Sequence, residues 1–522
     1  MPSQSPAEPT QTPTAQPPEP RRSASRGAFI LMGGTLGSRV TGLLRNALFL
    51  QLFAPTVTDA LNVALKVPNL FRELLAEGAL TNSFVPVYRE LVGEDAKGLA
   101  SALFSLLLVI NALLVLLAVW SAPWIVGLLL QEDANIDFAL TVTLTRTVFP
   151  FLAAISFSAL AMGILQAEER FFAPAWAPVA LNVVTAALML LYPGQAVPLA
   201  VAFVLGGLAQ LLAQIPALVR HNLLPRLGHW WHPALSGVLI LMVPFTFTTG
   251  ARQFLNVVAT NVLSALPRGS VTAFENANLF LGLALGLFSI SPALAYYSRL
   301  SANAAHEPER FPETLLEGLR LITFLTVPAG LLLFFLAAPA IQSVFNWLSA
   351  VRPGGGMDPQ VLRLSVLALA PLGLAVFPIG LRNLLIRTFY ARRSVVTPIV
   401  ISTAFISLNA LLYTLLAPRY GIVGLSWSTV VVEWAQLFVL ATYVYRREAF
   451  PLGVFLRHIL RVWLAAGSAA GLMLLGLDLL PPPSVWSDFL IRAVLGVGTL
   501  GFFYLLFSVH LRLPEVRWLV RR

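Results

Sequence analysis

The chain has 522 residues, of which 57% are hydrophobic and only 11% are charged, and its mean hydropathy is +0.79. Soluble domains carry about a quarter charged residues, so this composition excludes an ordinary soluble enzyme, a disordered chain and a nucleic-acid-binding module. The chain contains no cysteine, which excludes disulfides, thiolate metal sites and cysteine nucleophiles. Its net charge of +10 indicates orientation in a membrane rather than nucleic-acid binding.

The first 26 residues are rich in Pro, Ser, Gln and Thr and end in a cluster of arginines. Apolar sequence follows at once, without a short apolar segment and a small-residue cleavage site. We therefore expect a disordered cytoplasmic tail over residues 1–26 and a retained first membrane span rather than a signal peptide.

Apolar stretches long enough to cross a bilayer recur almost without pause to the C-terminus. A spanning helix needs roughly 20 such residues, and division at charged or Pro/Gly breaks predicts about 14 spans in an all-α, polytopic membrane protein. The expected spans are residues 27–52, 60–88, 98–130, 137–165, 172–192, 196–219, 234–264, 271–299, 315–346, 360–388, 395–417, 420–445, 455–480 and 487–511.

The basic residues alternate across the expected loops. Only Arg268, Arg352 and Arg419 fall in loops opposite the N-terminus, whereas most other loop arginines lie on its side. Since short cytoplasmic loops carry the excess of basic residues, we expect both termini in the cytoplasm.

Two pairs of segments repeat at nearly the same offset: residues 165–174 with 389–398, and 209–211 with 435–437. Chance similarity between apolar helices is the alternative explanation. A true duplication would relate spans 1–6 to spans 7–12 about an axis along the membrane normal. We then expect an N-lobe over residues 27–225, a C-lobe over 226–448, and two accessory helices with a basic cytoplasmic C-terminus over 449–522.

Four of the expected spans carry polar or ionisable side chains at helical spacing. Such groups are costly at membrane depth and usually face a wet interior. The stripes predict a hydrated cavity between the lobes. They comprise Ser38, Arg39, Arg45 and Asn46; Asn62, Lys66, Asn69, Arg72, Glu73 and Glu77; Thr249, Arg252, Gln253, Asn256 and Thr260; and Glu275, Asn276 and Asn278.

Two explanations of these stripes remain open. Arg39 or Arg72 could pair with Glu73 or Glu77 in an internal ion-pair network. The alternative is a cationic cavity for an anionic ligand, since the planar guanidinium suits phosphate oxygens. Glu433, in the twelfth expected span, is either a proton or cation site or a buried acid with a local partner.

Signatures of enzymes, metal sites and cofactors are absent from the sequence. The histidines form no metal-ligand spacing, and the run of glycines at residues 354–356 lacks the strand and helix of a phosphate-binding loop. We therefore expect a protein that is not an enzyme, with no metal and no cofactor.

The first two spans resemble a known family, the lipid II flippases called MurJ or MviN, within the multidrug/oligosaccharidyl-lipid/polysaccharide exporter superfamily. The resemblance is densest over residues 37–45 and continues in 58–60, 68–79 and 83–86. Weaker similarity extends through most of the chain, at residues 163–166, 172–182, 286–288, 389–398 and 421–425.

The resemblance implies 14 helices in two six-helix lobes and two accessory C-terminal helices. It also implies a cationic cavity, a hydrophobic groove built with helices 13 and 14, and transport of lipid II from the inner to the outer leaflet by alternating access. It places the protein in the bacterial plasma membrane, with lipid II and membrane lipids as ligands and cell-wall synthesis proteins as candidate partners, and with no nucleic acid.

The family's functional positions fall on residues of this chain. The resemblance and the polar stripes together give Arg39, Arg45, Arg72, Arg252, Asn69 and Asn278 as expected substrate-binding residues. Asp59, Glu73 and Glu77 are the expected gating residues, pairing with arginines to close the cavity.

This chain departs from the family pattern at two positions. Leu279 stands where the family usually has an arginine, and we expect Arg252 to substitute for it. Ser394 stands where some members have an acid used for sodium binding, which makes sodium coupling doubtful.

Other functions compete with lipid II transport. A related exporter could move another polyprenyl-linked saccharide, an integral membrane enzyme could act on the same lipid, and a scaffold for cell-wall assembly could transport nothing. The polar stripes favour a transporter.

Overall fold

The computed structural model describes residues 22–75, 79–351, 356–448 and 450–516. Within these ranges, the side chains of residues 22–29, 31–32, 74–75, 79, 81–82 and 243–252 are not described. Every regular element in the described ranges is helical, as expected for an all-α membrane protein.

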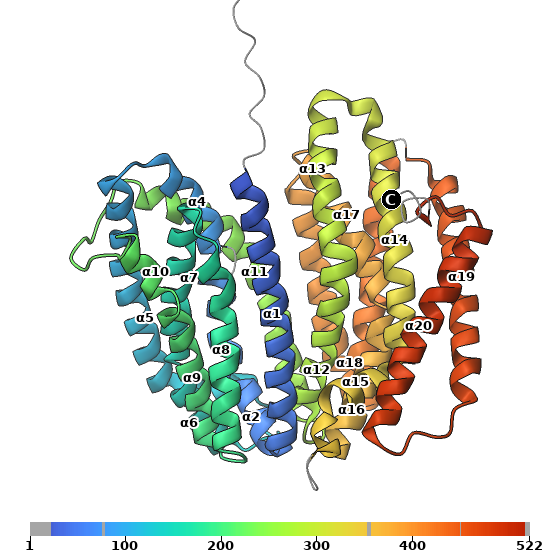
Figure 1. The fold of residues 1–522 in the computed structure, drawn as a ribbon, viewed down its shortest axis with the longest axis horizontal. Helices are drawn as coiled ribbons and strands as arrows, with labels where there is room; N and C mark the ends of the chain where they lie inside the picture. Colours follow the sequence, from blue (N-terminus) through green and yellow to red (C-terminus); the bar gives the residue numbers. More distant parts are fainter. Residues whose placement is uncertain (1–21, 76–78, 352–355, 449, 517–522) are drawn as a thin grey trace, which may run out of the picture.

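The first ten helices form a bundle on one side of the molecule, drawn in blue to green in Figure 1. In this first bundle α1 packs along α8, and α8 along α9. The helices are α1 (Arg22–Leu52), α2 (Pro55–Ala64), α3 (Lys66–Leu75), α4 (Ala79–Glu90), α5 (Glu94–Leu129), α6 (Phe138–Val148), α7 (Phe151–Ala167), α8 (Phe172–Leu191), α9 (Ala196–Leu212) and α10 (Ile215–Arg220).

The later helices form a second bundle, in yellow-green to red (Figure 1), and α11 contacts both bundles through α4, α5 and α18. The bundles approach each other where α2, α12 and α16 lie, and we call this the closed end. The helices are α11 (Leu235–Ser264), α12 (Ser270–Leu285), α13 (Ser291–His306), α14 (Phe311–Phe335), α15 (Ala337–Phe345), α16 (Pro359–Gly373), α17 (Val376–Ala391), α18 (Val396–Arg447), α19 (Leu452–Asp478) and α20 (Trp486–His510), with short helical turns at Gly286–Ile290, Pro308–Arg310 and Trp347–Ala350.

Several expected spans are broken rather than continuous. The second span, expected as one helix over residues 60–88, consists of α2, α3 and α4. Pro68 explains the first break, because a proline has no N–H and its ring clashes with the carbonyl four residues earlier, here that of Ala64. Conversely, α18 contains two expected spans, which meet at Gly421 with φ 59° and ψ −145°, a conformation that suits glycine.

Nine described helices or helix pairs are long and apolar enough to cross a membrane, and α16 with α17, bent by 50°, would make a tenth. This number is lower than the 14 expected spans for structural reasons. One of the ten, α18, contains two expected spans. Three more expected spans correspond to α1, α11 and the broken segment α2–α4, which are not among the ten, so each expected span has its helices in the structure. The chain is a multi-pass membrane protein.

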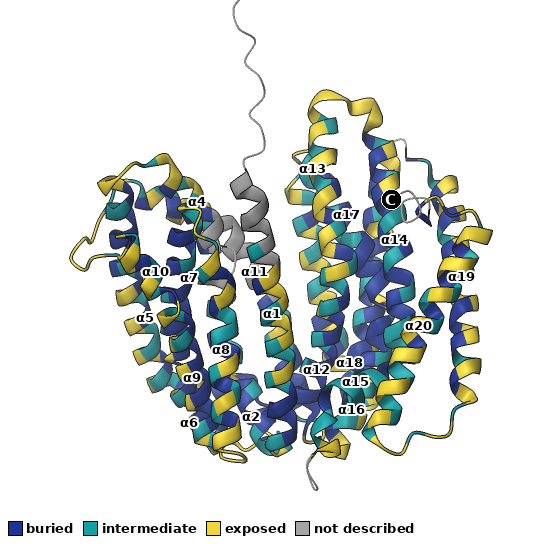
Figure 2. Cartoon of the chain, in the orientation of Figure 1, coloured by how far each residue is buried: buried dark blue, intermediate teal, exposed yellow. Residues whose placement is uncertain are grey.

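Large apolar side chains cover the outward faces of the bundles, where Figure 2 shows much yellow. On α5, for example, Trp120, Trp124 and Leu128 are 67%, 68% and 71% exposed. Such a surface is unfavourable in water and matches the hydrocarbon of a bilayer, in which the helices satisfy their own backbone hydrogen bonds.

Close backbone contacts hold the second bundle together. A Cβ atom added to Gly373 of α16 would lie 2.7 Å from the carbonyl oxygen of Gly330 in α14. Only glycine permits this approach, which is typical of helix packing in membranes.

Candidate functional site

A cavity of about 660 Å³ lies among α1, α7, α8 and α12. Arg39, Arg45 and Arg72 line it together, and no described carboxylate lines it. The guanidinium of Arg45 lies over the ring of Phe203, 5.3 Å from its centre. A cavity with this charge suits an anion with several oxygens, such as a phosphate group.

Helix α1 carries two of these arginines and is fixed against α8. The side-chain amide of Asn182 donates to the carbonyl oxygen of Ser38 at 3.1 Å and to the hydroxyl of Thr41 at 3.3 Å. Gly42 lies beside this asparagine: a Cβ there would be in van der Waals contact with its amide nitrogen, at 3.4 Å. The contacts set the rotation of α1 so that Arg39 and Arg45 line the same cavity.

Two further cavities adjoin the first, and Arg72 lines all three. The second, of about 210 Å³, also contains Asn69 and Glu275. The third, of about 430 Å³, is lined by Glu73 and Asn278 among other polar groups. We call the three together the central cavity. It is cationic beside α1 and has mixed charge beside α11 and α12.

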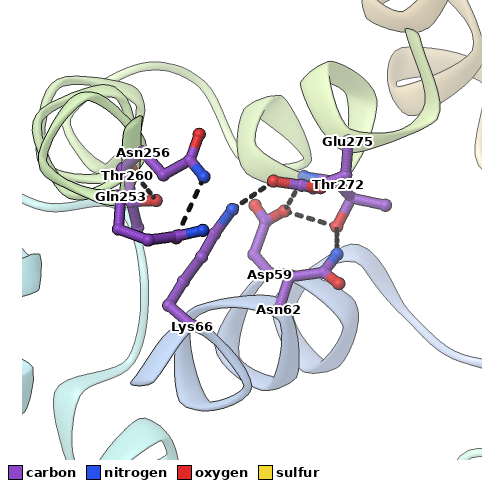
Figure 3. A network of polar contacts seen from close by, with 8 residues as sticks. All are labelled: Asp59, Asn62, Lys66, Gln253, Asn256, Thr260, Thr272 and Glu275. Atoms are coloured by element: carbon purple, nitrogen blue, oxygen red, sulfur yellow. Dashed lines mark hydrogen bonds and ion pairs between the residues drawn. The ribbon is translucent and has the colours of Figure 1, made fainter. Parts of the chain in front are cut away.

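The carboxylate of Asp59, at the closed end, crosses from α2 to the N-terminus of α12 (Figure 3). It accepts hydrogen bonds from the backbone N–H groups of Gly269 at 2.5 Å and Thr272 at 2.9 Å, and from the Thr272 hydroxyl at 2.7 Å. The first N–H groups of a helix have no partner within the helix and carry partial positive charge, so a carboxylate there is stabilised.

More polar pairs join the bundles beside Asp59, at the wall of the central cavity. Asn62 donates to the Thr272 hydroxyl at 3.0 Å, and Lys66 forms an ion pair with Glu275 (Figure 3). In the same region Asn46 of α1 donates to Asn276 of α12 at 3.3 Å. We call the contacts that Asp59, Asn62 and Lys66 make with the N-terminal part of α12 the polar zipper.

Comparison with known proteins identifies the family. The sequence profile described as lipid II flippase MurJ matches residues 50–494. The chain is 33% identical over 467 residues to the lipid II flippase MurJ of Burkholderia cenocepacia, covering 86% of this chain and 89% of the relative. The chain belongs to the lipid II flippase MurJ family. A probable lipid II flippase MurJ of Bdellovibrio bacteriovorus is also 33% identical, over 428 residues, covering 79% of this chain and 80% of that protein.

Solved structures agree with this fold. A lipid II flippase MurJ in an inward closed conformation superposes with a TM-score of 0.74 at 23% identity, covering 92% of this chain and 99% of that one. An inward-facing multidrug resistance MATE family transporter of the MOP superfamily gives a TM-score of 0.63 at 14% identity, covering 79% of this chain and 94% of that one. The MurJ-family chain therefore has the fold of this superfamily.

The residues predicted for this MurJ-family site fall into three groups. Arg39, Arg45, Arg72, Asn69, Asn278 and Glu73 all line the central cavity. Asp59 lies apart from it at the closed end and binds a helix N-terminus; the expected pairing with an arginine is wrong for this conformation. The side chains of Arg252 and Glu77 lie outside the described residues.

Leu279, at the position where the MurJ family usually has an arginine, lines both the first and the second cavity. Its side chain therefore borders the site that Arg45 and Arg72 supply with charge. Within the described residues, the cationic character of this part of the cavity comes from α1 and α3.

The hydrophobic groove that the MurJ resemblance implies, built with helices 13 and 14, stays a prediction. An apolar pocket of about 620 Å³ lies along α18, with Trp463 of α19 and Leu374 after α16, and no described residue of α20 lines it. The lining residues are Leu374, Trp427, Val430, Val431, Trp434, Ala435, Phe438 and Trp463.

Glu433, which the sequence left open as a proton or cation site, has a basic partner. Its carboxylate lies 3.0 Å from Arg382 of α17, which also donates to Gln436 at 3.3 Å. The Gln436 amide donates in turn to Ser402 at 3.0 Å. This network joins α17 to both halves of α18.

Two contacts could not be predicted from the sequence: the cross-bundle pairing of Lys66 with Glu275 and the stacking of Arg45 on Phe203. Lys66 and Glu275 do stand in the predicted polar stripes, which is the only signal that could have indicated them. Their partnership depends on how α3 and α12 face each other, which a periodic pattern does not specify.

Proposed function

We propose that this chain moves lipid II, the lipid-linked peptidoglycan precursor, from the inner to the outer leaflet of the bacterial plasma membrane. The observation that carries the proposal is the cluster of Arg39, Arg45 and Arg72 around a cavity with no described carboxylate in its lining. Guanidinium groups gathered on one cavity suit a ligand with several anionic oxygens, because each can form bidentate hydrogen bonds with a phosphate group.

The parts of the ligand divide among the parts of the site. The pyrophosphate binds Arg39, Arg45 and Arg72, where bidentate hydrogen bonds to phosphate oxygens are available. The sugar and peptide groups occupy the mixed polar part, which Asn69 and Asn278 line. The polyprenyl tail stays in lipid and follows the apolar groove on α18 and α19.

Movement between the leaflets takes place by alternating access. The N-lobe of residues 27–225 and the C-lobe of residues 226–448 rock against each other, with both termini in the cytoplasm. The closed end then faces the outside, and Asp59 is its gating residue. A ligand shifts the equilibrium between the inward-open and outward-open states only if it binds them with different affinities. Some contacts in the cavity must therefore differ between the two states.

Three other functions compete with this proposal. An exporter of a different polyprenyl-linked saccharide would use the same arginines, so the headgroup distinguishes it from a lipid II flippase. An enzyme that acts at the closed end needs an accessible acid or base there, and one candidate, Asp59, is 2% exposed and already binds a helix N-terminus. A scaffold has no need of a cationic cavity.

Binding of lipid II to the protein in nanodiscs tests the proposal. We expect Arg39→Gln, Arg45→Gln and Arg72→Gln each to weaken binding about tenfold, because each removes charged hydrogen bonds. Arg299→Gln is the matched control, since Arg299 pairs with Glu317 on an exposed surface and does not line the central cavity. Wild-type affinity in all three cavity variants would rule out the arginine site.

A further inference from the structure

We propose that the ion pair between Lys66 and Glu275 is a latch that an anionic ligand releases from inside the central cavity, freeing the closed end to open. This inference rests on the proposed function, since it assigns the pair a role in coupling ligand binding to gating. The pair is placed for that role by its position in the polar zipper.

The zipper runs along one face of α2 and α3. Asp59, Asn62 and Lys66 follow at spacings of three and four residues, which places them in a row on neighbouring helical turns. They contact α12 in the same order: Asp59 and Asn62 meet Thr272, and Lys66 meets Glu275, one turn further along (Figure 3). Separation of the bundles at the closed end must break every one of these contacts.

The contacts differ in how far a ligand can reach them. Asp59 is 2% exposed, and its bonding partners are backbone and hydroxyl groups of the opposite bundle. The side chains of Lys66 and Glu275 are 19% and 41% exposed, and both line the third cavity. Asn62 also lines the second cavity, but its contact with Thr272 is a neutral hydrogen bond. The ion pair is therefore the zipper contact on which the charge of a bound anion acts directly.

The charges determine the direction of the effect. Glu275 lines the second cavity together with Arg45 and Arg72, the arginines that would hold the pyrophosphate. An anion at these arginines repels the Glu275 carboxylate and attracts the Lys66 ammonium. Because an ion pair exposed to this degree contributes little net stability, a multivalent anion can compete for the lysine.

The consequence is a coupling between the two sites. With the cavity empty, Lys66 joins the bundles through Glu275; with an anion bound, Lys66 joins the ligand instead. The ligand then binds more tightly to the conformation in which the bundles have separated at the closed end than to the conformation in which they are joined there. This difference in affinity shifts the equilibrium between the two conformations. Neutral headgroups without phosphate would leave the latch shut.

The test measures opening of the closed end directly. Because the chain has no native cysteine, spin labels can be attached at Asp133→Cys and Gln360→Cys, two exposed positions at that end. Pulsed electron resonance then gives the distance distribution in nanodiscs without ligand, with inorganic pyrophosphate, or with lipid II. In the wild type we expect either anion to add a population at longer distance.

Glu275→Gln is the decisive variant, because it breaks the pair but keeps every cation of the cavity. We expect it to raise the long-distance population about fivefold without ligand and to reduce the further response to either anion, and we expect Lys66→Gln to do the same. Glu317→Gln is the control, since it breaks an exposed ion pair within the second bundle and leaves the zipper intact.

The outcomes separate the latch from the proposed function. A Glu275→Gln protein that responds to both anions like the wild type overturns the latch while leaving lipid II transport standing. A wild type that opens with pyrophosphate but not with lipid II supports the latch and contradicts the proposed cargo. A wild type that opens with neither anion overturns the latch.

Discussion

The carboxylate of Asp59 accepts a 2.9 Å hydrogen bond from the backbone N–H of Thr272, and so joins α2 of the first bundle to the start of α12 in the second. The Asp59 side chain thereby satisfies N–H groups that α12 itself cannot satisfy. At this contact the two bundles are held together by a charge and a helix N-terminus, in addition to the ion pair between Lys66 and Glu275.

Asp59→Asn should weaken the closed end. The neutral amide keeps the shape but loses the charge that interacts with the helix N-terminus, and we expect a loss of about 1 to 2 kcal/mol. A cysteine at Leu279, which lines the cavity, should then react several times faster with an impermeant thiol reagent added outside. Asp133→Cys, already exposed, is the control and should react equally in both backgrounds. An unchanged reaction rate at position 279 would show that Asp59 does not hold the closed end shut.

The stacking of Arg45 on Phe203 should matter less than the charge of Arg45. We expect Phe203→Leu to lower lipid II affinity about threefold, because an aromatic face contributes about 0.5 to 1 kcal/mol to the orientation of a guanidinium. Arg45→Gln should lower it about tenfold. Titration calorimetry in nanodiscs compares the two variants, and an equal loss in both would show that stacking, not charge, controls this position.

The network around Glu433 should contribute to stability. The side chains of Arg382 and Glu433 are 21% and 12% exposed, and removing one partner of such a pair leaves the other without its charge partner. We expect Glu433→Leu to destabilise the protein by about 3 kcal/mol, and Arg382→Met with Glu433→Leu to recover part of the loss. Thermal unfolding in detergent measures both. Glu317→Leu, at an exposed pair, should cost less than about 1 kcal/mol.

Gly373 should tolerate no side chain. Gly373→Ala places a methyl group against the carbonyl of Gly330 and the backbone N–H of Phe334, and we expect destabilisation of about 1 to 3 kcal/mol. Gly467→Ala in α19 is the matched control: no atom lies within 4 Å of its added Cβ, so it should stabilise the helix slightly. Thermal unfolding in detergent measures both variants. The same unfolding temperature for the two would show that the contact between α14 and α16 leaves room for a side chain.

Part of this architecture follows from the sequence. Bilayer thickness fixes the length of an apolar helix, so hydropathy alone predicts helices such as α19 and α20 closely. Periodicity likewise predicts that Arg39 and Arg45 belong to one polar face, and the structure places both on one cavity.

Other features depend on tertiary contacts that a sequence pattern does not contain. The break between α2 and α3 at Leu65 has a local cause in Pro68, but one continuous span was predicted because apolar residues continue on both sides of the break. Asp59 was expected to meet an arginine, yet its partners are the Thr272 hydroxyl and two backbone N–H groups. Backbone N–H groups are the same for every residue type other than proline, so a sequence pattern does not indicate them.

Transport of fluorescent lipid II in liposomes tests the central claim most directly. A reductant added outside destroys the dye in the outer leaflet, so the rate at which protected lipid becomes accessible reports its movement across the bilayer. We predict protein-dependent movement in the wild type and in Arg299→Gln, and a loss of at least tenfold in Arg45→Gln. Equal rates in wild-type, Arg45→Gln and protein-free liposomes would contradict lipid II transport by this protein through the arginine-lined cavity.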